Sequence, residues 1–205
     1  MKLTLQEGRA NKVHLLIDGE YRMTADREFI ALAGITNNME LDDTELAALS
    51  EQVNSRRAFN RAADLLSRRD HSKSELIGKL RQKGFGADAA QFAAERMEEL
   101  GYLNDRRFAE RFAAELAQNK GFGLRRIAAE LFRKGISRAI IDEVLNTLEL
   151  PEDGLQALIE RKFQKNLSTE QGLRRTFNAL IRMGYAPGAI REALRNYTEQ
   201  TEDCE

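Results

Sequence analysis

The sequence predicts a mainly α-helical protein, in which three tandem three-helix repeats form an elongated, curved array after a small N-terminal α+β module. The chain has only 2 prolines in 205 residues, well below average, and is rich in the strong helix formers Ala, Leu, Arg and Glu. A glycine turn also recurs at a nearly constant interval. With 42% hydrophobic and 32% charged residues, the chain has enough apolar side chains to form a core.

The first 25 residues have the pattern of an antiparallel sheet. Three strands are expected, at residues 2–6, 13–17 and 20–25. The pair Asp18-Gly19 between the last two suits the two-residue loop of a type I′ hairpin. An isolated hairpin is marginally stable in water, so we expect it to pack on two short helices. These are predicted at residues 26–33 and 42–53, the second starting at a capping box formed by Asp42 and Glu45. A continuing helix that joins this module to the next segment is kept as an alternative.

From about residue 58 the chain repeats a helix, a glycine stop and a further helix. The glycine turns are Lys83-Gly84-Phe85, Lys134-Gly135-Ile136 and Met183-Gly184-Tyr185, separated by 51 and then 49 residues. Each turn follows two residues four apart on one helix face: Leu76 and Leu80, Ile127 and Leu131, Thr176 and Leu180. Glycine adopts the left-handed conformation at low cost, so each turn is expected to be a Schellman cap.

A helix before each of these pairs completes the repeats and sets the domain boundaries. The predicted divisions are an N-terminal extension at 1–54, repeats at 55–103, 104–150 and 151–197, and an acidic tail at 198–205. Helix starts are expected at Asn104, at Ser72 with Glu75, at Ser168 with Gln171, and at Pro151 and Pro187.

The net charge of −1 conceals an uneven distribution along the chain. Residues 1–54 hold 5 basic and 10 acidic side chains, residues 55–197 hold 27 and 19, and residues 198–205 hold 0 and 4. The segments therefore carry net charges of −5, +8 and −4. Because the local field steers association, the middle segment is expected to meet an anionic partner.

Basic side chains recur at matching positions of the repeats, which predicts a basic ridge on the second and first helices. The candidate partner-binding residues are Lys79, Lys83, Arg107, Arg111, Arg125, Arg126, Arg133, Lys134, Arg174, Arg175 and Arg182. The leading candidates are the pairs Arg125-Arg126 and Arg174-Arg175, each following a Gly-Leu dipeptide. An arginine fork binds carboxylate or phosphate equally well, so the sequence leaves open whether this ridge meets protein or DNA.

Few residues could support catalysis, and we expect no catalytic residue, no metal and no cofactor. The single cysteine, Cys204, and two distant histidines, His14 and His71, argue against a disulfide framework or a metal site. No phosphate loop, dinucleotide fingerprint or zinc-protease motif occurs, and Lys120-Gly121-Phe122-Gly123 is interpreted as a turn between helices. Without an apolar run of membrane length or a signal peptide, the expectation is a soluble, cytoplasmic monomer that makes no membrane contact. An enzyme with an unrecognised site is kept as a third alternative.

A helix-turn-helix that reads DNA is disfavoured by the charge of the third helices. The helix predicted at 88–100 sets Arg96 against four acidic residues, and that at 137–149 sets Arg138 against three. Acidic helices approach phosphates poorly. A helical repeat protein that binds nucleic acid through its basic ridge remains the main alternative.

Several motifs in order resemble the RecX regulatory proteins. They are the stretch from Leu65 to Ser72 with Glu75-Leu76, Lys79-Leu80 and Lys83-Gly84-Phe85, then Leu100-Gly101-Tyr102-Leu103-Asn104-Asp105 with Arg107-Phe108-Ala109, and then residues 123–136. The resemblance covers residues 58–149 well and 151–197 more loosely. The acidic extension at 1–54, and Met183 where earlier repeats have lysine, depart from the pattern.

The resemblance implies three tandem repeats without catalytic activity that bind the RecA recombinase filament on DNA. Members of that family are thought to lie in the filament groove and bridge neighbouring RecA subunits. They would thereby modulate, and most simply inhibit, filament growth, ATP hydrolysis, strand exchange and coprotease activity. A place in recombinational DNA repair and the SOS response follows from the same resemblance, with single- or double-stranded DNA as a further partner.

Overall fold

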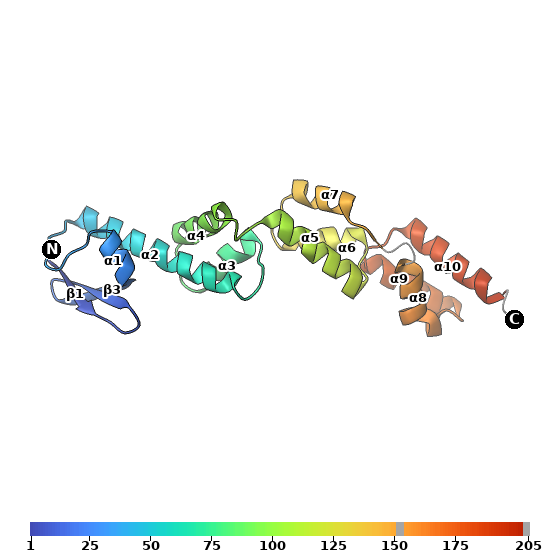
Figure 1. The fold of residues 1–205 in the computed structure, drawn as a ribbon. Helices are drawn as coiled ribbons and strands as arrows, with labels where there is room; N and C mark the ends of the chain where they lie inside the picture. The colour runs from blue at the N-terminus through green and yellow to red at the C-terminus, as the bar shows by residue number, and fades with distance from the viewer. Residues whose placement is uncertain (151–153, 203–205) are drawn as a thin grey trace. The chain divides into compact units, whose positions relative to one another are not determined.

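The computed structural model describes residues 1–150 and 154–202, the last five of these by backbone alone (Figure 1). The described chain is mainly helical, with one small sheet near its N-terminus, as predicted. The elements in chain order are β1 (Leu3–Glu7), β2 (Lys12–Ile17), β3 (Glu20–Asp26), α1 (Arg27–Leu32), α2 (Asp43–Leu66), α3 (Lys73–Gln82), α4 (Ala87–Glu99), α5 (Asp105–Glu115), α6 (Leu124–Arg133), α7 (Arg138–Thr147), α8 (Gly154–Phe163), α9 (Glu170–Arg182) and α10 (Pro187–Glu202). A π-helical turn at Leu116–Lys120 extends α5, and a 3-10 turn at Gln164–Asn166 follows α8.

The chain folds into two compact units. Unit 1 comprises Met1–Asp70 and Leu76–Leu103, and unit 2 comprises His71–Glu75 and Asn104–Glu205. The first residues of α3 therefore belong with unit 2 and the rest of α3 with unit 1. The predicted assembly of all three repeats into one elongated array stays a prediction.

The sheet is antiparallel in the order β1-β2-β3. Asp18 and Gly19 both have positive φ, 49° and 86°, which confirms the predicted type I′ turn. A register irregularity between Leu15 and Leu16 of β2 gives this hairpin a bulge. Leu3 and Leu15 are fully buried and belong to the apolar core that the sheet shares with α1 and the first half of α2.

Helix α2 is longer than the helix predicted at residues 42–53 and agrees with the alternative of a helix that continues into the next segment. Its start is confirmed: the Asp42 carboxylate accepts from the Glu45 N–H at 2.8 Å, and the Glu45 carboxylate accepts from the Asp42 N–H at 2.9 Å. The helix predicted to stop at residue 53 continues to Leu66, because no glycine or proline interrupts it and Ala58 and Ala62 continue its buried side. The predicted boundary between residues 54 and 55 falls inside this helix, and the domain boundaries stay predictions.

Each group of three helices encloses an apolar core. In unit 1, the second half of α2 packs with α3 and α4 around side chains that include Leu80 and Met97. In unit 2, α5, α6 and α7 share a core with Ile127 and Leu131, while α8, α9 and α10 share a core with Leu180. The residue pairs used to align the repeats therefore point into the cores, as their spacing predicted.

The glycine stops are Schellman caps, as predicted. Gly84, Gly135 and Gly184 have φ values of 88°, 78° and 91°. In each cap the residue after the glycine donates its N–H back to the helix: Phe85 to Leu80 at 3.3 Å, Ile136 to Leu131 at 3.2 Å, and Tyr185 to Leu180 at 3.2 Å.

Of the other predicted helix starts that lie within the described residues, all but one are confirmed. Asn104 caps α5, Ser72 accepts from the Glu75 N–H, and Pro187 is the first residue of α10. The predicted start of α9 at Ser168 is wrong, because Thr169 is the N-cap and its hydroxyl accepts from Gly172 at 3.1 Å. Pro151 and Cys204 lie outside the described residues. No helix in the described ranges is long and apolar enough to cross a membrane.

Candidate partner-binding surface

The second helices of the repeats, α3, α6 and α9, can be aligned through their glycine stops. Offsets of 51 and 49 residues place Leu76, Ile127 and Thr176 at one equivalent position, and all three are buried. Arg125 aligns with Arg174, and Arg126 with Arg175, as the sequence suggested. Helix α9 has an extra turn at its start, so the glycine that precedes its arginines lies inside the helix.

Within unit 2, the start of α6 meets the end of α9 through backbone atoms. We call this contact, formed by residues 121–126 and 183–185, the α6–α9 joint. The Gly123 N–H donates to the Met183 carbonyl at 2.8 Å. A Cβ added to Gly123 would lie 2.6 Å from the carbonyl oxygen of Gly184. The joint therefore requires glycine on both sides, and the predicted turn at Lys120–Gly123 is confirmed with this further role.

One side-chain hydroxyl also contributes to the α6–α9 joint. The phenol of Tyr185 donates to the Gly121 carbonyl at 3.1 Å. Burial raises the pKa of the Tyr185 phenol above its ordinary value of 10.0, because desolvation disfavours the phenolate. The hydroxyl is therefore protonated at neutral pH and available as a donor.

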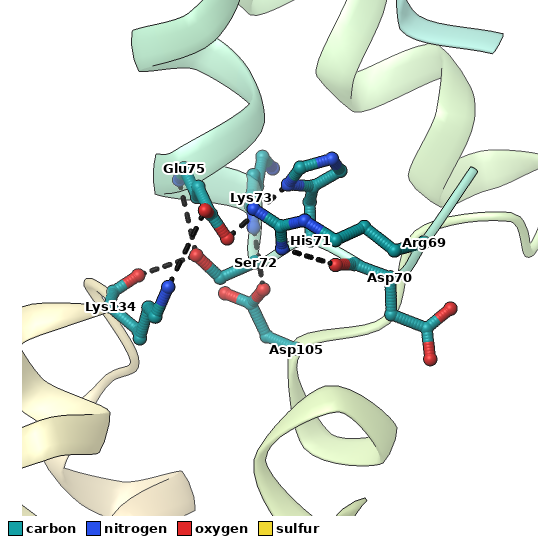
Figure 2. Close-up of polar contacts among 8 residues, drawn as sticks. All are labelled: Arg69, Asp70, His71, Ser72, Lys73, Glu75, Asp105 and Lys134. Carbon is teal, nitrogen blue, oxygen red and sulfur yellow. Dashed lines mark hydrogen bonds and ion pairs between the residues drawn. The ribbon is translucent and has the colours of Figure 1, made fainter. Parts of the chain in front are cut away.

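The corresponding contact between the start of α3 and the end of α6 is polar, as Figure 2 shows. We call this contact, formed by residues 71–75 and 133–135, the α3–α6 joint; both segments belong to unit 2. The hydroxyl of Ser72, fully buried, donates to the Lys134 carbonyl and accepts from the Glu75 N–H at 3.1 Å. The Lys134 ammonium lies 3.4 Å from the Glu75 carboxylate. Ser72 thus caps its own helix and satisfies a carbonyl at the end of another.

His71, which belongs to this joint, and Asp105, which lies beside it, make further polar contacts in Figure 2. His71 is 3% exposed, and its Nδ1 lies 3.3 Å from the Glu75 carboxylate. The Asp105 carboxylate accepts from the Lys73 N–H at 2.7 Å. The burial of the His71 imidazole was not predicted from the sequence.

Among the predicted ridge residues, Arg111 has an intramolecular partner, and the contacts of Arg126, Arg133 and Lys134 are as follows. The Arg126 guanidinium lies 2.8 Å from Glu130 and 5.5 Å from the ring centre of Phe122. Arg133 also pairs with Glu130. Besides its contact at the α3–α6 joint, Lys134 lies over a phenylalanine ring at 5.5 Å. Their charges are partly neutralised within unit 2, which the sequence analysis missed.

Most of the remaining ridge candidates are exposed. In unit 2 these are Arg107 and Arg111 on α5, Arg125 on α6, and Arg174, Arg175 and Arg182 on α9. In unit 1, Lys83 is exposed and Lys79 is half-buried. Arg125 and Arg174 form no hydrogen bond or ion pair with any other described residue. A continuous basic stripe through all three repeats stays a prediction.

Exposed apolar side chains also lie on the helices that carry these arginines, and they were not predicted from the sequence. Phe132 on α6 is 71% exposed, and Ile181 at the equivalent position of α9 is 37% exposed. Each lies seven residues after an exposed arginine, Arg125 or Arg174, and that spacing was the signal available in the sequence.

The third helices have the acidic surfaces that disfavoured DNA reading. Glu95 and Glu98 of α4 are exposed, and Arg96 pairs with Glu99 at 2.7 Å. On α7 the Arg138 guanidinium lies 4.0 Å from Asp142. No cluster of His, Cys, Asp or Glu within the described residues could hold a metal ion.

Two segments match described protein families. Residues 58–97 match the family described as RecX, first three-helix domain, and residues 104–145 match RecX, second three-helix domain. The matched segments span much of the helix groups α2–α4 and α5–α7.

Similar proteins named "Regulatory protein RecX" occur in several bacteria. The protein of Trichlorobacter lovleyi is 40% identical over 64% of this chain and 89% of its own length. That of Chlorobium phaeobacteroides is 36% identical over 68% of this chain and 92% of its own length. A 28% identical relative from Caldanaerobacter subterraneus covers 93% of this chain and 95% of its own length.

Solved structures share the fold. A chain described as the crystal structure of regulatory protein RecX matches with a TM-score of 0.73 at 18% identity, covering 95% of this chain and 98% of that one. RecX from Lactobacillus salivarius matches with a TM-score of 0.62 at 20% identity, over 70% of this chain and 96% of its own.

Proposed function

We propose that this chain, which belongs to the RecX family of regulatory proteins, binds the RecA recombinase filament on DNA and inhibits it. Its action would limit filament growth, ATP hydrolysis, strand exchange and coprotease activity. It would act in the cytoplasm as a monomer, by stoichiometric binding rather than by turnover, in recombinational repair and the SOS response.

The observation that carries this proposal is the exposed basic face shared by α6 and α9. Arg125 and Arg174 occupy equivalent positions in consecutive repeats and lack a partner among the described residues. Long charged side chains are usually solvated, and one exposed arginine would mean little. Their recurrence at one repeat position supports a surface that binds an anionic partner.

The test is a pair of charge-reversal variants that change the net charge equally. R125E/R174E removes the two equivalent exposed arginines, whereas R9E/R22E reverses two exposed arginines near the sheet. Arg126 is spared, because its reversal would disturb Glu130 and the α6–α9 joint. We expect R125E/R174E to bind RecA filaments on single-stranded DNA more weakly by about tenfold. R9E/R22E should bind as the wild type does.

If both variants bind RecA filaments equally well, the exposed basic face of α6 and α9 does not contribute to binding, and that part of the proposal is wrong. Failure of the wild-type chain to bind filaments under any condition would contradict the proposed function itself. Helix content and melting temperature should be unchanged in both variants, since exposed charges contribute little to stability.

Direct nucleic-acid binding is the second candidate, favoured by the same arginines because their forks also fit phosphate. Salt dependence separates the two. If phosphates are the partner, each lost contact should reduce the log-log salt slope for naked DNA by about 0.7 to 0.9. Binding to a protein partner need not show this salt dependence, which arises from the release of counterions from DNA.

A further inference from the structure

Helices α6 and α9 present the same exposed pattern on one face. An arginine is followed by a short side chain four residues later, an apolar one seven residues later and a second arginine eight residues later. On α6 these are Arg125, Ala129, Phe132 and Arg133, and on α9 they are Arg174, Asn178, Ile181 and Arg182. All eight are exposed, and their spacing places them on one side of each helix.

The third helix of the set shows that this pattern is not required by the fold. The equivalent positions of α3 hold Ser74, Gly78, Arg81 and Gln82, with no apolar side chain among them. A single exposed apolar residue is common on protein surfaces and carries little meaning. An apolar residue that recurs between two arginines, at one position of two consecutive repeats, indicates a shared contact.

The chemistry of the two apolar side chains distinguishes between protein and nucleic acid. Bases are bound by stacking on flat aromatic or guanidinium faces. Phe132 offers such a face, but Ile181 at the equivalent position does not. The property that the two share is hydrophobicity, which suits an apolar pocket on a protein.

The arginines beside Phe132 and Ile181 indicate which charged groups would surround such a pocket on the partner. Arg125, Arg174 and Arg182 form no ion pair with described residues, and Arg133 is already paired with Glu130. Phenylalanine and arginine are enriched in the buried centres of protein interfaces, and arginine is also enriched among the residues that dominate binding energy. The arginines would meet carboxylates at the rim.

From this arrangement we propose that Phe132 and Ile181 are the apolar anchors of this surface and that each enters an apolar pocket rimmed by carboxylates on a protein partner. The inference rests on the proposed function, in which that partner is the recombinase filament. It adds that the contact of α6 and α9 is made with protein and that its strength depends on the anchors as well as on the arginines.

The experiment compares substitutions at the anchors with one elsewhere. Phe132→Ser and Ile181→Ser should each weaken filament binding roughly tenfold, as removal of a binding hot spot does. Leu32→Ser is the matched control, because Leu32 is 79% exposed on α1 and lies outside the pattern. It should bind as the wild type does, and circular dichroism should show the wild-type helix content in all three.

Conservative substitutions separate an apolar anchor from a stacking platform. Phe132→Leu should retain filament binding within about threefold, because a leucine still fills an apolar pocket. On naked single-stranded DNA, Phe132→Ser and Phe132→Leu should both behave as the wild type. No group that carries charge is removed, so the salt slope should stay unchanged.

The possible failures are distinguishable. If the wild type binds filaments and Phe132→Ser binds equally well, the inference is wrong while the proposed function stands. If Phe132→Leu loses as much binding as Phe132→Ser, and both lose affinity for naked DNA, the face stacks on nucleic acid instead. Absence of wild-type binding to filaments overturns the proposed function and the inference together.

Discussion

The two joints of unit 2 occupy corresponding places in the repeat and use different chemistry. At the α3–α6 joint a buried hydroxyl and an ion pair connect the helices, whereas at the α6–α9 joint two glycines let backbone approach backbone. The difference follows from two aligned positions: Ser72 corresponds to Gly123, and Lys134 in one glycine turn corresponds to Met183 in the next. Equivalent helix contacts in the repeats can therefore be stabilised by side-chain hydrogen bonds at one joint and by close backbone contact between glycines at the other.

The largest effect is expected from closing the space at the α6–α9 joint. Gly123→Ala would bring its Cβ within 2.6 Å of the Gly184 carbonyl oxygen and force the two backbones apart. We expect a loss of about 3 kcal/mol in the free energy of unfolding, measured by urea denaturation. Gly188→Ala is the control, because no atom of the described residues lies within 4 Å of its added Cβ and α10 should gain helix propensity. Equal stability of the two variants would contradict the close contact.

The α3–α6 joint should be broken by removing one hydroxyl. Ser72→Ala loses a helix cap and leaves the Lys134 carbonyl without its buried donor. The expected cost is about 2 kcal/mol of unfolding free energy. Ser137→Ala serves as the control, since Ser137 caps the exposed start of α7 and nothing else. If Ser72→Ala and Ser137→Ala lower the unfolding free energy equally, the Ser72 hydroxyl contributes only as a helix cap and the joint does not depend on it.

A stabilising change is expected beside the α6–α9 joint. Thr176 is 1% exposed and its hydroxyl has no hydrogen-bond partner among the described residues, whereas the equivalent residue of α6 is Ile127. Thr176→Val should raise the unfolding free energy by about 1 kcal/mol, because a buried hydroxyl without a partner is removed. The reciprocal change, Ile127→Thr, should lower it. A destabilised Thr176→Val protein would show that the hydroxyl has a partner.

The smallest effect concerns pH. Because the pKa of Tyr185 is raised in the folded chain, the folded state keeps its phenolic proton at pH values where the unfolded state loses it. Its contribution to stability is therefore present below about pH 10 and declines as pH rises through the folded-state pKa. Tyr185→Phe should remove that part of the alkaline decline in melting temperature. An identical decline in both proteins would assign it to other groups.

Local signals in the sequence were sufficient for much of the fold. Asp18-Gly19 predicted the hairpin because both residues tolerate positive φ, and the three glycine stops predicted the helix ends for the same reason. The end of α2 was placed at residue 53 because the predicted boundary followed a change in charge, and a continuing helix was only the alternative. The helix does continue, because no glycine or proline interrupts it.

The contacts of the candidate surface were harder to predict from the sequence, because some of its residues have partners that are distant in the chain. Lys134 looked like one more ridge residue, yet it meets Glu75, which lies 59 residues away. Arg126 and Arg133 share Glu130 on their own helix, a pairing that spacing alone could have suggested. The exposure of Phe132 depends on how α6 packs, and an apolar residue in an amphipathic helix is usually assigned to the core.

The central claim, stoichiometric inhibition of a recombinase filament, is tested most directly by titrating this chain into RecA on single-stranded DNA while measuring ATP hydrolysis. The account predicts a rate that falls with added chain and levels off at a fixed ratio to RecA, with R125E/R174E shifting the curve to higher concentrations. An unchanged rate at equimolar chain, together with tight binding of the chain to naked DNA, would contradict it. So would loss of activity that grows with time at trace amounts of chain, which would indicate turnover.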